Sequence, residues 1–227
     1  MAAEENSSLE QKERQQQAAQ AGAAFSEEPV RIAVFVSGGG TNLQALLDAQ
    51  RRGELPHGRI RLVVSNRADA YALIRAEKAG VKTAVVSRDE ARLLHLLEAE
   101  KIELIVLAGY LAILSEHFTK CYADRILNIH PSLIPSFCGK GFYGLKVHEA
   151  ALQYGVKVTG ATVHYVNEVP DGGKILLQKA VNVEEGDTPE VLQQRVMREA
   201  EWILLPKAAE LVSRKLLSER QTKAQEG

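Results

Sequence analysis

Short apolar runs alternate with segments of helical periodicity through the first half of the chain. Residues 32–36 are continuously apolar, which is typical of a parallel strand buried on both faces. Residues 43–47 then have helical spacing. This order predicts a doubly wound α/β fold with right-handed crossovers. The same alternation predicts further strands at 60–65, 83–86, 104–108 and 126–129, and helices at 69–79 and 88–101.

The pattern changes in the second half, where two predicted strands follow one another with only a short, turn-rich loop between them. Such a connection requires the two strands to be antiparallel. A final long helix is predicted after them, with Asp187 or Thr188 as its cap and Pro189 in its first turn. We therefore expect a Rossmann-like, mostly parallel sheet with an antiparallel strand in the C-terminal half. The predicted elements here are a helix at 146–154 and strands at 158–166 and 174–183.

The ends of the chain differ from its centre in composition. The first 28 residues are rich in Ala, Gln, Glu and Ser, and they lack the basic start and apolar segment of a signal peptide. Such a composition buries little apolar surface. We expect a disordered extension at 1–29, a single domain at 30–217 and a flexible tail at 218–227.

Bulk composition excludes several classes of function. Of the 227 residues, 45% are hydrophobic and 25% charged, as in ordinary soluble domains. A formal net charge of −1 argues against a nucleic-acid-binding surface, and the longest apolar stretch, 104–114, is too short to span a bilayer. Cys121 and Cys138 have no spacing that suggests a metal site or a disulfide framework. These features predict a cytoplasmic protein with reduced thiols and without membrane or nucleic-acid partners.

The loop Gly38-Gly39-Gly40-Thr41-Asn42 joins a predicted strand to a predicted helix. Its glycines allow the backbone to approach a ligand, and the helix N-terminus favours an anion. The loop lacks the Walker lysine, and Leu43 stands where the dinucleotide fingerprint requires glycine. A phosphate monoester is therefore favoured over a nucleotide. The alternative is a simple turn in which Thr41 caps the helix.

Asn128 and His130 lie two residues apart at the end of a predicted strand, so their side chains point to the same face. In open α/β sheets, ligands bind at this carboxyl edge. Taken singly, each residue has a structural explanation. His130 could be a satisfied core histidine, Asn128 a cap, Asp171 a turn former, His164 a structural residue on a strand face and Glu201 a solvated acid.

Taken together, the glycine loop, Asn128-Ile129-His130-Pro131 and Asp171-Gly172-Gly173 resemble the folate-dependent phosphoribosylglycinamide formyltransferase family. The resemblance runs from about residue 31 to 212. It implies the formyltransferase fold and transfer of the formyl group of 10-formyltetrahydrofolate to the amine of glycinamide ribonucleotide, in de novo purine (IMP) biosynthesis. It implies neither a metal nor a covalent intermediate. Other matching segments are 64–70, 106–110, 160–164 and 186–190.

The resemblance also assigns roles to residues. Asn128 would stabilise the oxyanion, His130 would protonate the departing folate nitrogen, and Asp171 would raise the pKa of His130. For the ribonucleotide, Gly40, Thr41 and Asn42 would hold the phosphate and Glu201 would meet the amine. For the folate, the assigned residues are Arg88, Leu111, Ala112, Ile113, Leu114, Asn128, Asn167, Glu168, Val169, Pro170 and Asp171.

The chain departs from the family pattern at the folate site. Ala112 stands where the family usually has arginine, and loop 138–144 replaces the more familiar Pro-Gly-x-His segment. The region that carries Arg88 is short.

Three other functions compete with this hypothesis: a formyltetrahydrofolate deformylase, a formyltransferase for initiator tRNA, and a ligand-binding protein without chemistry. The ends of the chain are short for the extra domains of the first two, and the three catalytic residues argue against the third. We expect a monomer or homodimer acting on small molecules.

Overall fold

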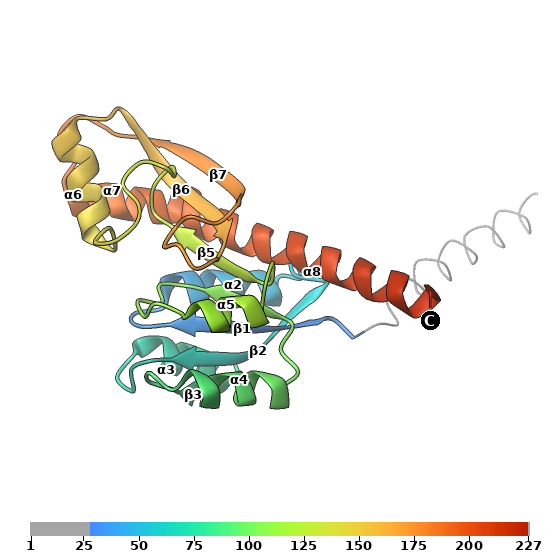
Figure 1. Ribbon diagram of the computed structural model, residues 1–227. Helices are drawn as coiled ribbons and strands as arrows, with labels where there is room; N and C mark the ends of the chain where they lie inside the picture. The colour runs from blue at the N-terminus through green and yellow to red at the C-terminus, as the bar shows by residue number, and fades with distance from the viewer. Residues whose placement is uncertain (1–27, 227) are drawn as a thin grey trace, which may run out of the picture.

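Seven strands form one mixed sheet, in the order β3-β2-β1-β4-β5-β6-β7 (Figure 1). The structure is a computed structural model and describes residues 28–226. Strands β1 to β5 pair in parallel, whereas β6 is antiparallel to β5, and β7 to β6. The predicted fold class is confirmed. The strands are β1 (Val30–Val36), β2 (Gly58–Ser65), β3 (Lys82–Val85), β4 (Leu104–Leu107), β5 (Ile126–His130), β6 (Val158–Tyr165) and β7 (Ile175–Asn182).

Helices cover both faces of this sheet, because side chains alternate along each strand. In β1, Ile32 and Val34 pack into a core with α2, α3 and α8, while Ala33 and Phe35 pack on the opposite face with α4 and α5. The helical elements are α2 (Thr41–Arg51), α3 (Tyr71–Lys78), α4 (Glu90–Ala99), α5 (Glu116–Cys121), α6 (Leu145–Tyr154), α7 (Pro189–Val196), the π-helix η1 (Met197–Glu201) and α8 (Trp202–Glu226).

The final helical region is segmented rather than one continuous α-helix. Thr188 caps α7, accepting from the Val191 N–H, and Pro189 occupies its first turn, as the sequence predicts. The π-helix η1 then separates α7 from α8. Sequence periodicity did not predict it, because a single wide turn hardly disturbs an apolar pattern. The short helix α5, which Ser115 caps, was also not predicted.

The ends of the domain differ from the expected boundaries in one respect. The helix α8 continues to Glu226 and extends beyond the strands (Figure 1), so most of the segment expected as a flexible tail is helical. Arg220 fixes this part of the helix, because it donates to the Glu28 carbonyl at 2.9 Å and pairs with Glu103 at 2.5 Å. The expected N-terminal extension lies outside the described residues except for its last two. Within residues 28–226, no helix is long and apolar enough to cross a membrane.

Candidate active site

Asn128 and His130 project from the carboxyl end of β5 toward Asp171, which lies in the loop between β6 and β7. The Asp171 carboxylate bridges the two side chains. Its Oδ2 lies 3.5 Å from His130 Nδ1, and its Oδ1 lies 3.4 Å from Asn128 Nδ2. The structure therefore brings together the three residues that the sequence analysis singled out as catalytic.

Asp171 is held in place by its own loop and by loop 138–144. Its backbone has φ +56°, and the Gly139 N–H donates to Oδ2 at 2.8 Å. Glycine is required two residues later, because a Cβ on Gly173 would lie 1.7 Å from the Tyr165 carbonyl oxygen. Burial raises the pKa of Asp171, but the contact with His164, the hydrogen bond from the Gly139 N–H and the charges of the two imidazoles outweigh burial, and the net pKa is lowered. The carboxylate is therefore ionised at neutral pH.

His130 is 4% exposed, and both ring nitrogens have partners. Nε2 lies 2.9 Å from the Phe137 carbonyl oxygen, which can only accept, so Nε2 carries a hydrogen. In the neutral ring the Nδ1 lone pair then faces Asp171, and protonation converts this contact into an ion pair. Burial nevertheless lowers the pKa of His130, outweighing the opposite effects of Asp171 and the Phe137 carbonyl. Asp171 thus raises the pKa of His130, as the sequence analysis expects, but burial is the larger effect and leaves the net pKa below its ordinary value.

His164 is a member of this cluster that the sequence analysis treated as structural. The register of β6 against β5 places it opposite Asn128. Its Nδ1 lies 2.7 Å from the Tyr165 carbonyl oxygen and so carries the hydrogen of the neutral ring, which leaves Nε2 to accept from Asn128 Nδ2 at 3.1 Å. His164 therefore fixes the direction of the Asn128 amide. Only the strand pairing, which a single sequence does not reveal, identifies it.

The glycine loop lies at the carboxyl end of β1 and leads directly into α2. Gly40 takes the N-cap position with φ 74° and ψ 35°, and no side chain caps the helix. The first N–H groups of a helix have no intrahelical partners, so they are available to an anion. Thr41 is the first residue of α2 and adds a hydroxyl at this end. The geometry suits a phosphate group.

Asn42 and Glu201 were assigned to different parts of the substrate, yet their side chains touch. Asn42 Nδ2 donates to Glu201 Oε2 at 2.5 Å. Glu201 is the last residue of the π-helix η1 and is 5% exposed, so it is not the solvated acid of the alternative interpretation. Wide turns of this kind occur frequently at functional sites. Burial raises the pKa of Glu201 to about 7, although the bond from Asn42 opposes the shift. The carboxyl group thus titrates near physiological pH.

A cavity of about 630 Å³ opens beside this cluster. Its size is within the range of small-molecule sites. Asn128, His164 and Asp171 line the side of the cavity next to the cluster. The other walls include the expected folate residues Leu111, Ala112, Ile113, Leu114, Asn167, Glu168, Val169 and Pro170, together with 139–143.

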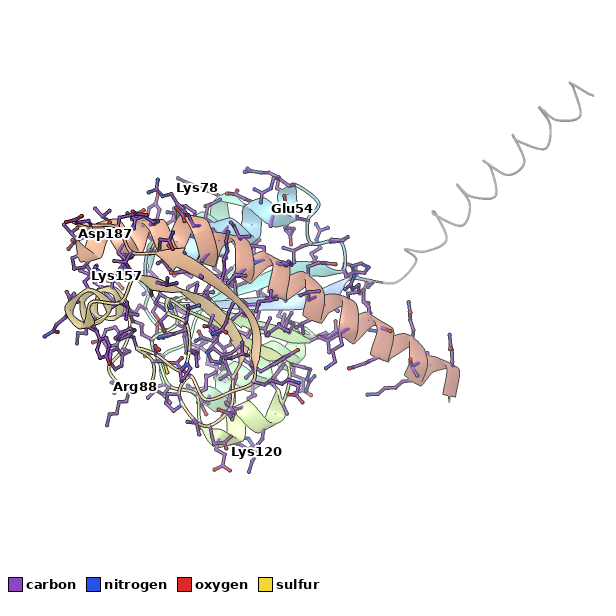
Figure 2. The ribbon with its side chains drawn as sticks, turned by 90° about the horizontal axis from the view of Figure 1, so that it is seen from above. Glu54, Lys78, Arg88, Lys120, Lys157 and Asp187 are labelled. Atoms are coloured by element: carbon purple, nitrogen blue, oxygen red, sulfur yellow. The ribbon has the colours of Figure 1, made fainter. Side chains whose placement is uncertain are left out.

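Arg88, the remaining residue expected at the folate site, does not line this cavity. It is exposed, has φ +59° in the segment before α4, and lies at the periphery of the molecule (Figure 2). Among residues 28–226, Lys140 is the only lysine or arginine on the cavity wall, and the sequence analysis did not assign it to the site. The sequence feature that could have identified Lys140 is its position between Gly139 and Gly141, in the loop that departs from the family pattern.

Ser37 connects the glycine loop to the cavity. Its hydroxyl donates to Asn66 Oδ1 at 2.7 Å and accepts from the Leu111 N–H at 2.9 Å. One hydroxyl group therefore connects two backbone segments. The first leads into the glycine loop, and the second, at Leu111, lines the cavity. Among the residues that the structure describes, no group of three His, Cys, Asp or Glu is placed to hold a metal ion.

Comparisons with known proteins place the chain in a family. A family model described as formyl transferase matches residues 30–209. A phosphoribosylglycinamide formyltransferase of Haemophilus influenzae is 42% identical over 185 residues, which cover 78% of this chain and 84% of the relative. A solved structure, glycinamide ribonucleotide transformylase 1 from Symbiobacterium toebii, has a TM-score of 0.76 and 42% identity, covering 82% of this chain and 89% of that one.

Longer proteins contain a similar segment. The trifunctional purine biosynthetic protein adenosine-3 of Gallus gallus is 45% identical over 192 residues, which cover 81% of this chain. The chain spans only 18% of the length of that relative. The matched region is therefore one part of a larger polypeptide there and most of the polypeptide in the bacterial relative. The chain belongs to the formyl transferase family and, within it, to the phosphoribosylglycinamide formyltransferases.

Proposed function

We propose that the protein transfers the formyl group of 10-formyltetrahydrofolate to the amine of glycinamide ribonucleotide, in purine biosynthesis. The observation that carries the proposal is the cluster of Asn128, His130 and Asp171, with Asn128 and Asp171 on the wall of a cavity of about 630 Å³. The free N-terminus of α2 and the buried Glu201 supply the second substrate with a phosphate site and an amine site.

The reaction begins with the loss of a proton from the substrate ammonium group. Glu201, whose pKa is about 7, is matched to accept that proton at neutral pH. The free amine then attacks the formyl carbon, and the carbonyl oxygen becomes an oxyanion. Asn128 donates to this oxyanion by giving up its 3.4 Å bond to Asp171, the longer of its two contacts.

Breakdown of the tetrahedral intermediate needs a proton on the leaving nitrogen of the folate. His130 supplies it in its imidazolium form, which Asp171 stabilises against the effect of burial. The nitrogen of the new C–N bond gives up its second proton to water, the bond between the formyl carbon and the folate nitrogen breaks, and tetrahydrofolate leaves. The developing negative charge on the substrate favours the imidazolium, so His130 becomes protonated at this step.

Folate recognition on this proposal depends on Lys140 rather than on Arg88. A folate carries a glutamate with two carboxylates, and of the described residues Lys140 is the only lysine or arginine on the cavity wall. No described carboxylate forms an ion pair with it. The partners are two small molecules. The proposal places the reaction in the cytoplasm, in a monomer or homodimer, and calls for no metal, membrane or nucleic acid.

The deciding experiment measures tetrahydrofolate release from 10-formyltetrahydrofolate with and without glycinamide ribonucleotide. Release that depends on the ribonucleotide, with one formylated product per folate consumed, is the expected result. Equal release in buffer alone would establish a deformylase, which uses water as the acceptor. Release only with a charged initiator tRNA would establish a formyltransferase that acts on that tRNA.

A further inference from the structure

The carbonyl oxygens of three successive glycines in the phosphate-binding loop are all occupied. The Gly38 oxygen accepts from the Ala72 N–H at 3.0 Å, and the Gly40 oxygen accepts from the Gln44 N–H at 2.9 Å. The Gly39 oxygen accepts from Arg75 Nε at 2.8 Å. A carbonyl oxygen repels a phosphate, so the loop binds an anion only when these oxygens are directed elsewhere. The middle oxygen is the only one of the three that a side chain holds.

Arg75 is well placed to keep that oxygen fixed. Its Nη1 donates to Gln44 Oε1 at 3.0 Å, which ties α3 to the first turn of α2. Its guanidinium lies 5.1 Å from the centroid of the Tyr71 ring. The side chain is half-buried, and three contacts from different directions restrict it. Lysine has no planar fork with which to make the same set of bonds.

The charge of Arg75 is not neutralised by an acid. No carboxylate among residues 28–226 forms an ion pair with it, in contrast to Arg52, which donates to both oxygens of Glu54. A positive charge directly behind the loop adds to the partial charge at the N-terminus of α2. Both favour an anion on the loop.

The contact between α3 and the loop is close enough to constrain the backbone. Gly40 has φ +74°, and a Cβ there would lie 2.6 Å from the Ala72 side chain. The loop therefore takes its shape against the first turns of α3, and α3 is the element that presents Arg75. A hollow of about 300 Å³, lined by Arg75, Thr41 and Gln44, opens beside this contact.

We propose that Arg75 is a positioning residue for the phosphate of the ribonucleotide substrate, because it holds the Gly39 carbonyl away from the anion and places an unpaired positive charge behind the loop. This inference rests on the proposed function for the identity of the substrate. The existence of an anion site on the loop does not depend on the proposed function. Arg75 touches no reacting atom, so its effect falls on ribonucleotide binding and not on the chemical step.

The first test separates KM from kcat for Arg75→Ala and Arg75→Lys. The expected result for Arg75→Ala is a rise of about tenfold in KM for the ribonucleotide, with kcat and the KM for the folate within about twofold of the parent. Arg75→Lys keeps the positive charge but lacks the planar guanidinium group, so its KM for the ribonucleotide should lie between those of the parent and Arg75→Ala. Arg52→Ala is the matched control, because Arg52 lines the same hollow without touching the loop, and it should behave as the parent does.

The second test needs no catalysis. Inorganic phosphate should raise the Tm of the parent and of Arg52→Ala, and it should raise the Tm of Arg75→Ala much less, with all three proteins compared at equal ionic strength. An unchanged ribonucleotide KM in Arg75→Ala, or an equal phosphate effect on all three Tm values, overturns the inference. Loss of the phosphate effect in a protein inactive toward the ribonucleotide would sustain this inference and refute the proposed substrate.

Discussion

Replacement of Glu201 by glutamine should make the protein more stable at high pH and leave it nearly unchanged at low pH. Glu201 is 5% exposed, and burial raises its pKa from 4.5 to about 7. The folded state therefore binds a proton that the unfolded state has released between these values. A raised pKa contributes stability that is fully present below pH 4.5 and is lost as the pH rises through 7. Glutamine keeps the acceptor for Asn42 and cannot ionise.

The size of the effect follows from the shift. The rise from 4.5 to about 7 corresponds to roughly 3 kcal/mol over the full titration. Between pH 5 and pH 8 the parent should lose roughly 2 to 3 kcal/mol that Glu201→Gln retains, because the titration has already begun at pH 5 and is nearly complete at pH 8. This is a substantial part of the stability of an ordinary domain.

The assay is denaturant unfolding of both proteins at several pH values, with the free energies of unfolding compared at each pH. Contributions from other titrating groups are common to the two proteins and cancel in the difference. Glu199→Gln is the matched control, because Glu199 lies in the same π-helix but is exposed. If the difference between the parent and Glu201→Gln stayed constant to within about 0.5 kcal/mol from pH 5 to pH 8, the argument from burial would be refuted.

Three further predictions follow from the site. His130→Ala and Asp171→Asn should each lower kcat by roughly 10² or more while the unfolding midpoint stays close to that of the parent, and a near-full rate in steady-state assays would remove that residue from the mechanism. Lys140→Ala should raise the KM for formyl-folate about threefold to tenfold, but it should not change the KM for a folate analogue that lacks the glutamate. The control is Lys146→Ala, because Lys146 contacts the Tyr143 ring. Gly173→Ala should cost roughly 2 kcal/mol or more in denaturant unfolding, since its Cβ would lie 1.7 Å from a β6 carbonyl oxygen, and an unaltered midpoint would contradict that close approach.

The alternation of apolar runs and helices predicted most of the fold, because a parallel sheet buried on both faces leaves a clear pattern. The antiparallel arrangement of β6 and β7 followed from the shortness of their connection. The strand β5 was also predicted, and with it the common face of Asn128 and His130. These features depend on local sequence, which a single chain records directly.

Other features depend on contacts between distant parts of the chain. His164 joins the cluster only through the register of β6 against β5, and Glu201 enters the interior through a π-helix that the periodicity does not indicate. The pKa of His130 is a balance of burial against a nearby carboxylate, and the sequence reveals the carboxylate but not the depth of burial. Arg88 was placed at the folate site by resemblance alone, and the turn before α4 leaves it exposed.

The bond from the Gly139 N–H to Asp171 makes the position of loop 138–144 and the charge of a catalytic group interdependent. Without this bond Asp171 would lose a donor that lowers its pKa, and its carboxylate would be easier to protonate. Lys140 is the next residue, so any displacement of Gly139 would also displace Lys140. On the proposed function, a change in this loop would therefore weaken both the binding of folate carboxylates and the stabilisation of the His130 imidazolium. One backbone amide would couple folate binding to proton transfer.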